Sequence, residues 1–126
     1  MTAEELNAIR RQLLELREQL LGKLQARVHE AAGLSDEGVA DLEDQGLHER
    51  LKGFLHLLGD RDREKVLRVD DALERIAQGT YGLCERCEKP IATARLKAQP
   101  DSRYCLDCQA MVETEWDLKN PGQGTL

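Results

Sequence analysis

The sequence contains few aromatic residues, few prolines and no long apolar run. Only 3% of its 126 residues are aromatic, and a third are charged. Such a chain can build only a small core, so we expect a fold that is elongated or cross-linked. No run of about 18 apolar residues occurs, which argues against a membrane-spanning helix. The polar N-terminus has no signal-peptide stretch, and we therefore expect a cytoplasmic protein.

Basic residues and catalytic patterns are also scarce. The chain has 18 basic against 24 acidic residues, a net charge of −6. This balance counts against strong autonomous binding to a nucleic-acid backbone, which requires a basic face. The three histidines have no partner at ligand spacing, and no activated nucleophile is indicated. We therefore do not expect an enzyme.

No proline interrupts residues 1–89, which leaves room for long helices. Thr2 and Glu5 have the spacing of a capping box, which satisfies free N–H groups at a helix start. Apolar residues then recur at alternating spacings of three and four, the pattern of a coiled-coil seam. They are Leu6, Ile9, Leu13, Leu16 and Leu20, continued by Leu24 and Val28. Gly33 is the expected stop.

A second helix is predicted from about Leu47 to Gln78, after a loop at about 32–46 that is rich in glycine and acids. One apolar stripe comprises Leu47, Leu51, Phe54 and Leu58, and another comprises Val66, Val69, Leu73 and Ile76. The polar segment 59–65 lies between them, and Gly79 ends the helix. Two such helices of about thirty residues predict an antiparallel hairpin roughly 45 Å long.

The strongest chemical signal is a double pair of cysteines. Two residues separate Cys84 from Cys87, seventeen follow, and two separate Cys105 from Cys108. Zinc takes four soft ligands in a tetrahedron, and two residues between cysteines let both sulfurs reach one ion. Disulfides, a redox pair and an iron–sulfur cluster are the competing interpretations. In a reducing compartment the spacing favours one zinc ion per chain. Four protein ligands leave no open position, so the zinc is structural.

The sequence therefore predicts an all-α protein with three parts. Residues 1–80 form a long antiparallel coiled-coil hairpin with an acidic tip, and residues 81–118 form a small four-cysteine zinc finger with a short C-terminal helix. That helix is expected from about Leu106 to Leu118, with Met111, Val112 and Trp116 as its packing face. Residues 119–126 are expected to be a disordered tail.

The residues around the cysteines resemble the DksA/TraR zinc-finger family. The matching positions are Tyr81, Gly82, Leu83, Ile91, Arg95, Leu96, Ala98, Pro100, Tyr104 and Gln109, with the four cysteines. Upstream, Arg61-Asp62-Arg63-Glu64 matches that family's second helix. The resemblance implies a monomeric transcription regulator that binds RNA polymerase rather than a specific DNA sequence. It implies that the coiled-coil tip enters the secondary channel near the catalytic magnesium, while the zinc module braces the base against the polymerase rim.

The resemblance also indicates residues for the tip and for the alarmone ppGpp. The family's tip has two aspartates spaced by two residues and followed by alanine. Asp41 and Asp44 keep this pair, although Gln45-Gly46 follows, and counting back from Arg61 would place the second aspartate nearer Gly46. Arg63 is the candidate ppGpp contact. The next turns carry Val66, Val69, Asp70 and Asp71 where the best-known members are lysine-rich, which counts against dependence on ppGpp.

Two alternative functions remain open at this point. One is a zinc-ribbon module that binds nucleic acid directly, because Lys89, Arg95, Lys97 and Arg103 make the finger locally basic. The other is a coiled-coil stress or adaptor protein without a polymerase partner. The steep salt dependence of phosphate contacts would distinguish the first alternative.

Overall fold

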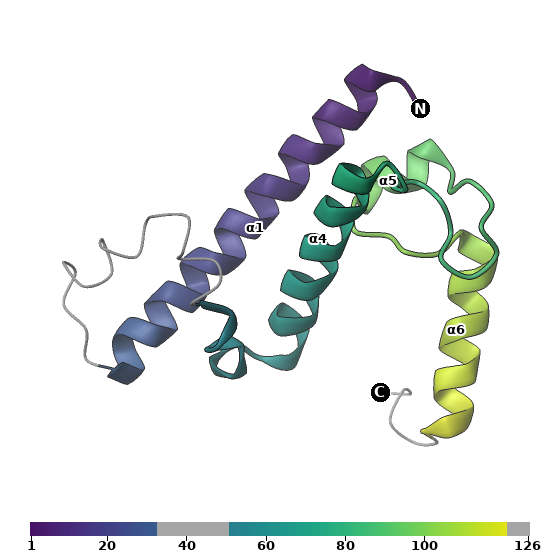
Figure 1. The fold of residues 1–126 in the computed structure, drawn as a ribbon. Helices are drawn as coiled ribbons and strands as arrows, with labels where there is room; N and C mark the ends of the chain where they lie inside the picture. Colours follow the sequence, from purple (N-terminus) through teal and green to yellow (C-terminus); the bar gives the residue numbers. More distant parts are fainter. Residues whose placement is uncertain (33–50, 121–126) are drawn as a thin grey trace.

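The computed structural model describes residues 1–32 and 51–120 of the chain (Figure 1). Helix α1 spans Ala3–Ala32 and helix α4 spans Asp60–Gln78, and the two pack side by side. They run antiparallel, because Arg17 of α1 contacts Asp70 while Lys23, further along α1, contacts Asp62, earlier on α4. The described residues form no β-strand beyond one isolated bridge. The predicted all-α hairpin is confirmed.

The predicted capping box forms at the start of α1. The Thr2 N–H donates to Glu5 Oε1 and the Glu5 N–H donates to Thr2 Oγ1, both at 3.1 Å. The hydrogen bond from the Thr2 backbone, with help from Lys97, lowers the pKa of Glu5 to about 2. The predicted seam is also confirmed, since its members are buried or half-buried along α1. Those that are fully buried are Ile9, Leu13, Leu20, Leu24 and Val28.

The prediction of one continuous second helix from Leu47 was wrong, because α4 begins only at Asp60. Before it lie a turn at Gly53 and the short 3₁₀ helix η1, Leu55–Leu57. Gly59, the residue before α4, has an extended backbone with ψ 159°. Two glycines six residues apart make a helix through this segment costly, at about 1 kcal/mol each relative to alanine. Residues 33–50 lie outside the described part of the chain.

The break changes how the first apolar stripe packs. Leu51 and Leu58 are buried against α1 as predicted, whereas Phe54 is exposed. Leu47 lies outside the described residues. Val66 and Val69 of the second stripe are buried, Leu73 and Ile76 are half-buried, and Ala72, absent from the prediction, is fully buried. Helix α4 ends at Gly79 as predicted, in the left-handed conformation with φ 78°.

Two clusters of buried side chains hold the molecule together. One lies along the hairpin and comprises Leu20, Leu24, Val28, Leu51, Leu58 and Val66. The other, which we call the base core, joins the hairpin to the finger. It comprises Ile9, Leu13, Val69, Ala72, Cys84, Ile91, Leu96 and Cys108. The finger therefore packs against the open end of the hairpin, next to the N-terminus (Figure 1).

The C-terminal part contains two helices, α5 (Thr93–Ala98) and α6 (Leu106–Lys119). The bounds of α6 match the prediction to one residue, but its predicted packing face was wrong. Met111 is 51% exposed and Trp116 47% exposed, and Cys108 is the buried residue of the helix. The reason is that α6 projects from the finger (Figure 1) instead of lying on another helix. Among the described residues, no helix is both long and apolar enough to cross a bilayer.

Candidate metal centre

The four cysteines lie together in the finger, although they come from two separate segments. Their Sγ atoms all lie within 4.8 Å of one another, and Cys87 Sγ is 3.8 Å from Cys105 Sγ. None of the four forms a disulfide. Four sulfurs at about 2.3 Å from one zinc ion would be about 3.8 Å apart, whereas a disulfide requires about 2.05 Å. The donor set and its spacing therefore fit a tetrahedral zinc ion.

Each cysteine pair has local structure that aims its sulfurs at a common point. The turn after Cys84 is closed by the Glu88 N–H donating to the Cys84 carbonyl at 2.9 Å. Glu88 has a positive φ of 63°, which this tight turn requires. Cys105 directly precedes α6, and Cys108 lies in its first turn. The start of this helix therefore positions the second cysteine pair.

Burial, hydrogen bonds and neighbouring thiols shift the pKa values of Cys84 and Cys108 in opposite directions. Burial raises the pKa of Cys84, but backbone hydrogen bonds from Cys87, Cys105 and Arg86 outweigh it and lower the pKa to about 6. Burial and the neighbouring thiols raise the pKa of Cys108 to about 12. Four thiolates as close together as these sulfurs repel one another, and a divalent cation at their centre offsets that repulsion. When bound, zinc would supply folding energy to this segment rather than an open catalytic position.

A close approach of the backbone explains a glycine at the start of the finger. Gly82 has φ 93°, and a Cβ there would lie 3.3 Å from Met1 Cε and 3.7 Å from Leu96 Cδ1. Its carbonyl accepts a hydrogen bond from the Ile91 N–H at 2.7 Å. The tight turn thus brings the start of the finger directly against Met1 and α5.

The other predicted site residues are not part of this cluster. Asp41 and Asp44 lie outside the described residues. Arg63 lies in the first turn of α4, where its guanidinium pairs with Asp60. Its side chain is 37% exposed.

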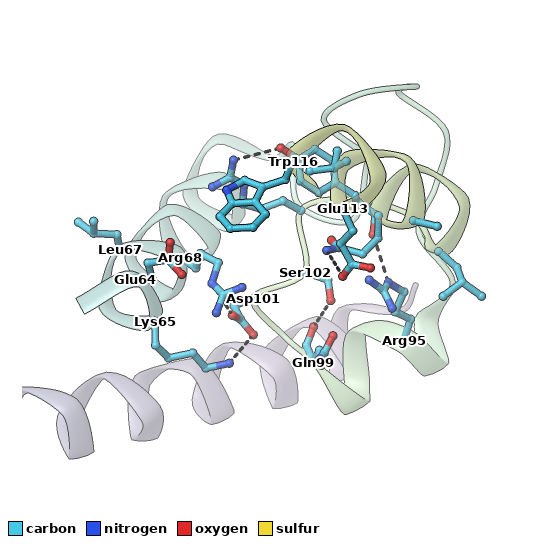
Figure 2. Close-up of a pocket in the computed structure, with 16 residues that line it drawn as sticks. Glu64, Lys65, Leu67, Arg68, Arg95, Gln99, Asp101, Ser102, Glu113 and Trp116 are labelled. Carbon is cyan, nitrogen blue, oxygen red and sulfur yellow. Dashed lines mark hydrogen bonds and ion pairs between the residues drawn. The ribbon is translucent and has the colours of Figure 1, made fainter. Parts of the chain in front are cut away.

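A groove next to the finger escaped the sequence analysis. It has a volume of about 810 Å³ and runs between α4 and α6. Figure 2 shows Leu67 and Arg68 on its α4 side and Trp116 on its α6 side, with Asp101 and Ser102 between them. Leu67 is 51% exposed, so both walls offer apolar surface. Sequence periodicity predicts which residues a helix buries, but it does not reveal a surface that two distant segments form together.

The fold and the cysteine cluster define a helical hairpin protein with a C4-type zinc finger. Residues 79–113 match the model of the prokaryotic dksA/traR C4-type zinc finger. Over 126 residues the chain is 33% identical to an uncharacterized protein of Aquifex aeolicus, covering 98% of this chain and 87% of the relative. It is 30% identical over 113 residues to the RNA polymerase-binding transcription factor DksA of Caulobacter vibrioides, covering 90% of this chain and 79% of the relative.

A solved structure agrees with these sequence matches. The transcription factor DksA2 from Pseudomonas aeruginosa superposes with a TM-score of 0.63 at 27% identity, covering 91% of this chain and 88% of that chain. The chain belongs to the DksA/TraR family, and its C4 zinc finger carries a structural zinc site.

Proposed function

We propose that this protein is a transcription regulator that binds bacterial RNA polymerase and is not an enzyme. The hairpin would enter the secondary channel tip first and modulate initiation, while the finger and α6 rest on the rim. The observation that carries the proposal is the base core, which joins the hairpin and the zinc finger into one body. A rod with a folded base can be held from outside while its far end reaches inward. The similarity to the RNA polymerase-binding transcription factor DksA of Caulobacter vibrioides supports the choice of partner.

The four cysteines are proposed as the ligands of the zinc ion, one ion per chain. Their clustering and the match to a C4-type finger support this assignment. The ion has a structural role, because four sulfur ligands leave no position for water or substrate.

The groove between α4 and α6 supports contact with a large protein partner. Leu67, Leu106 and Trp116 are exposed apolar side chains on its walls. Interfaces are enriched in such aromatic and aliphatic anchors. Direct binding to nucleic acid is disfavoured by the net charge of −6. A binding titration with duplex DNA would show a steep salt dependence if that alternative were correct.

The test of the proposal is binding and transcription with purified polymerase. We expect polymerase core enzyme to retain the tagged protein, and we expect excess protein to change transcript yield from a sensitive promoter. A protein that neither binds polymerase nor changes transcription would contradict the proposal and favour the stress or adaptor function.

The tip residues are tested by Asp41→Asn and Asp44→Asn, singly and together. In the proposed complex these carboxylates act near the polymerase magnesium, so each variant should bind polymerase but lose its effect on transcription. Their unfolding free energies should stay within about 0.5 kcal/mol of the parent, as is usual for surface substitutions. Glu43→Gln is the matched control. Full activity of the double variant would remove both aspartates from the tip role.

Arg63 is the residue proposed to contact ppGpp, if the alarmone takes part. Arg63 is already paired with Asp60, and the next basic residues, Lys65 and Arg68, are paired with Asp101. The turn beyond them carries Asp70 and Asp71. We therefore expect regulation to proceed without ppGpp. Transcription assays with and without ppGpp, on the parent and on Arg63→Ala, measure this directly.

A further inference from the structure

A buried carboxylate connects the loop before α6 to the hairpin. Asp101 follows Pro100 and is only 5% exposed. Its Oδ1 lies 2.9 Å from Lys65 Nζ, and its Oδ2 lies 3.5 Å from Arg68 Nε (Figure 2). Lys65 and Arg68 are three residues apart and thus share one face of α4. A single acid therefore holds two successive turns of the hairpin helix.

The residues on either side of Asp101 are also hydrogen-bonded to α4 or to the turn that follows it. The Tyr81 hydroxyl donates to the Pro100 carbonyl at 2.7 Å. The guanidinium of Arg75, which is only 8% exposed, donates to the Ser102 carbonyl at 3.4 Å. The segment 100–102 is thus bonded at three consecutive residues to α4 or to the turn that follows it.

This segment leads directly into the second cysteine pair and α6. Helix α6 buries Cys108 but leaves Leu106, Met111, Trp116 and Leu118 exposed. Besides Cys108, an ion pair between Arg86 and Glu115 links α6 to the first cysteine pair, with 2.6 Å between Nη2 and Oε1. The finger and α6 are therefore tied to each other, and the 100–102 segment ties them to α4.

We propose that Asp101 is a positioning residue that fixes the direction of the zinc finger and α6 relative to the hairpin. A buried charge is tolerated only with charged partners, and here both partners belong to the element that must be aligned. The ion pairs therefore favour one arrangement of the hairpin relative to the zinc finger and α6. Hydrophobic contacts of the base core are less directional. The same arrangement sets the width of the groove between α4 and α6, whose floor includes Asp101.

The orientation can be measured without polymerase. Residual dipolar couplings of backbone amides in the zinc-loaded chain report whether α4 and α6 share one alignment. We expect one common alignment tensor in the parent. In Asp101→Asn the α6 couplings should shrink relative to those of α4, or require a rotated tensor. Asp117→Asn removes an exposed acid from α6 itself and should behave like the parent.

A second route removes the partners and keeps Asp101. Lys65→Gln with Arg68→Gln changes side chains that are 31% and 44% exposed, and it should also loosen α6. If this variant or Asp101→Asn does not fold, Arg68→Gln alone remains testable, because Lys65 still pairs with the buried carboxylate. The variant with all three substitutions has no charge left without a partner at this position. It should therefore be more stable than the variant that removes only Lys65 and Arg68, but α4 and α6 should still not share one alignment. Unchanged relative orientation in both routes, even with a lower melting temperature, would overturn the proposal and leave Asp101 a stabilising residue only.

The consequence for polymerase rests on the proposed function, whereas the orientation does not. If the regulator binds as proposed, Asp101→Asn should require a higher concentration for half-maximal effect on transcription, while Asp117→Asn should not. Failure of the parent to bind polymerase would refute the proposed function alone. Parental activity of a variant with a loosened α6 would show that the orientation is not used in binding.

Discussion

Single side chains at the start of α1 show how local chemistry determines a helix end. Thr2 and Glu5 exchange two hydrogen bonds, and Lys97 of α5 lies 3.1 Å from Glu5 Oε2. The same carboxylate therefore caps α1 and contacts the finger. The capping bonds follow from sequence spacing alone, whereas the contact with Lys97 depends on the packing of residues far apart in the chain.

Glu5 makes stability depend on pH. Its pKa falls from 4.5 to about 2 on folding, so the folded state favours the ionised form. This stabilisation is complete above the unfolded pKa and disappears as the pH falls from 4.5 to about 2. We predict that the parent is more stable than Glu5→Gln at neutral pH and that the difference vanishes over that acidic range. Urea unfolding of both proteins at each pH measures it. A difference that persists below about pH 2 would contradict the assigned cause.

Adjacent leucines of α1 test the base core. Leu13 is fully buried, whereas Leu14 is 36% exposed. We predict that Leu13→Ala lowers the unfolding free energy by about 2–5 kcal/mol, because it opens a cavity in the core. Leu14→Ala should cost about 0.5 kcal/mol or less. Because Leu13 shares its cluster with Cys84 and Cys108, the first variant should also bind zinc more weakly in a chelator competition. Equal effects of the two variants would be inconsistent with this burial.

At the scale of elements, α6 differs from the other long helices because it exposes its apolar residues. Helices α1 and α4 have apolar residues at regular spacing that meet along the hairpin, and the sequence predicted most of them. The apolar residues of α6 have no such partner in the described chain, so treating them as a packing face was wrong. The exposure of Leu106 and Trp116 on the groove is a feature of binding surfaces rather than of a core.

Trp116 separates stability from binding. It is 47% exposed and lines the groove. We predict that Trp116→Ala leaves the unfolding free energy within about 0.5 kcal/mol of the parent. If α6 contacts polymerase as proposed, the same variant should lose about 1 kcal/mol or more of binding free energy. Leu118→Ala, on the same helix but outside the groove lining, is the control. A large loss of stability in Trp116→Ala would mean that the side chain is part of the core.

At the scale of the whole molecule, the hairpin has two separate cores, one next to the finger and one further along the hairpin. The base core contains Cys84 and Cys108 and therefore depends on the metal site. The cluster along the hairpin contains no cysteine. Local stability depends on the buried contacts within each region. The two cores should therefore differ in how much stability they lose when the metal is removed.

We predict that removing zinc loosens the finger and the adjacent base of the hairpin but not the remainder. After chelation, or in Cys105→Ser, hydrogen exchange should accelerate around Ile9, Leu13 and Val69, while Leu24 and Val28 remain protected. Metal analysis should find one zinc per parent chain and less in the variant. Restoring zinc to the chelated parent should restore protection. Uniform acceleration through both cores would show that the chain unfolds as one unit.

The sequence by itself determined the features that depend on neighbouring residues. The capping box, the seam of α1 and the paired cysteines follow from spacings of three or four residues, and the stop at Gly79 follows from a glycine that can adopt a positive φ. Helix geometry and metal coordination translate such spacings directly into structure. Gly53 and Gly59 were also visible, but the apolar stripe around them suggested a continuous helix.

Only the tertiary structure decided the features that join distant segments. Among these are the base core shared by hairpin and finger, the exposed face of α6 and the burial of Asp101 between Lys65 and Arg68. An aspartate after a proline reads as a solvated loop residue, and two basic residues on a helix read as a solvated face. Whether such charges are exposed or buried depends on which surfaces meet, because burial of a charge is favourable only where its partners are already held in place.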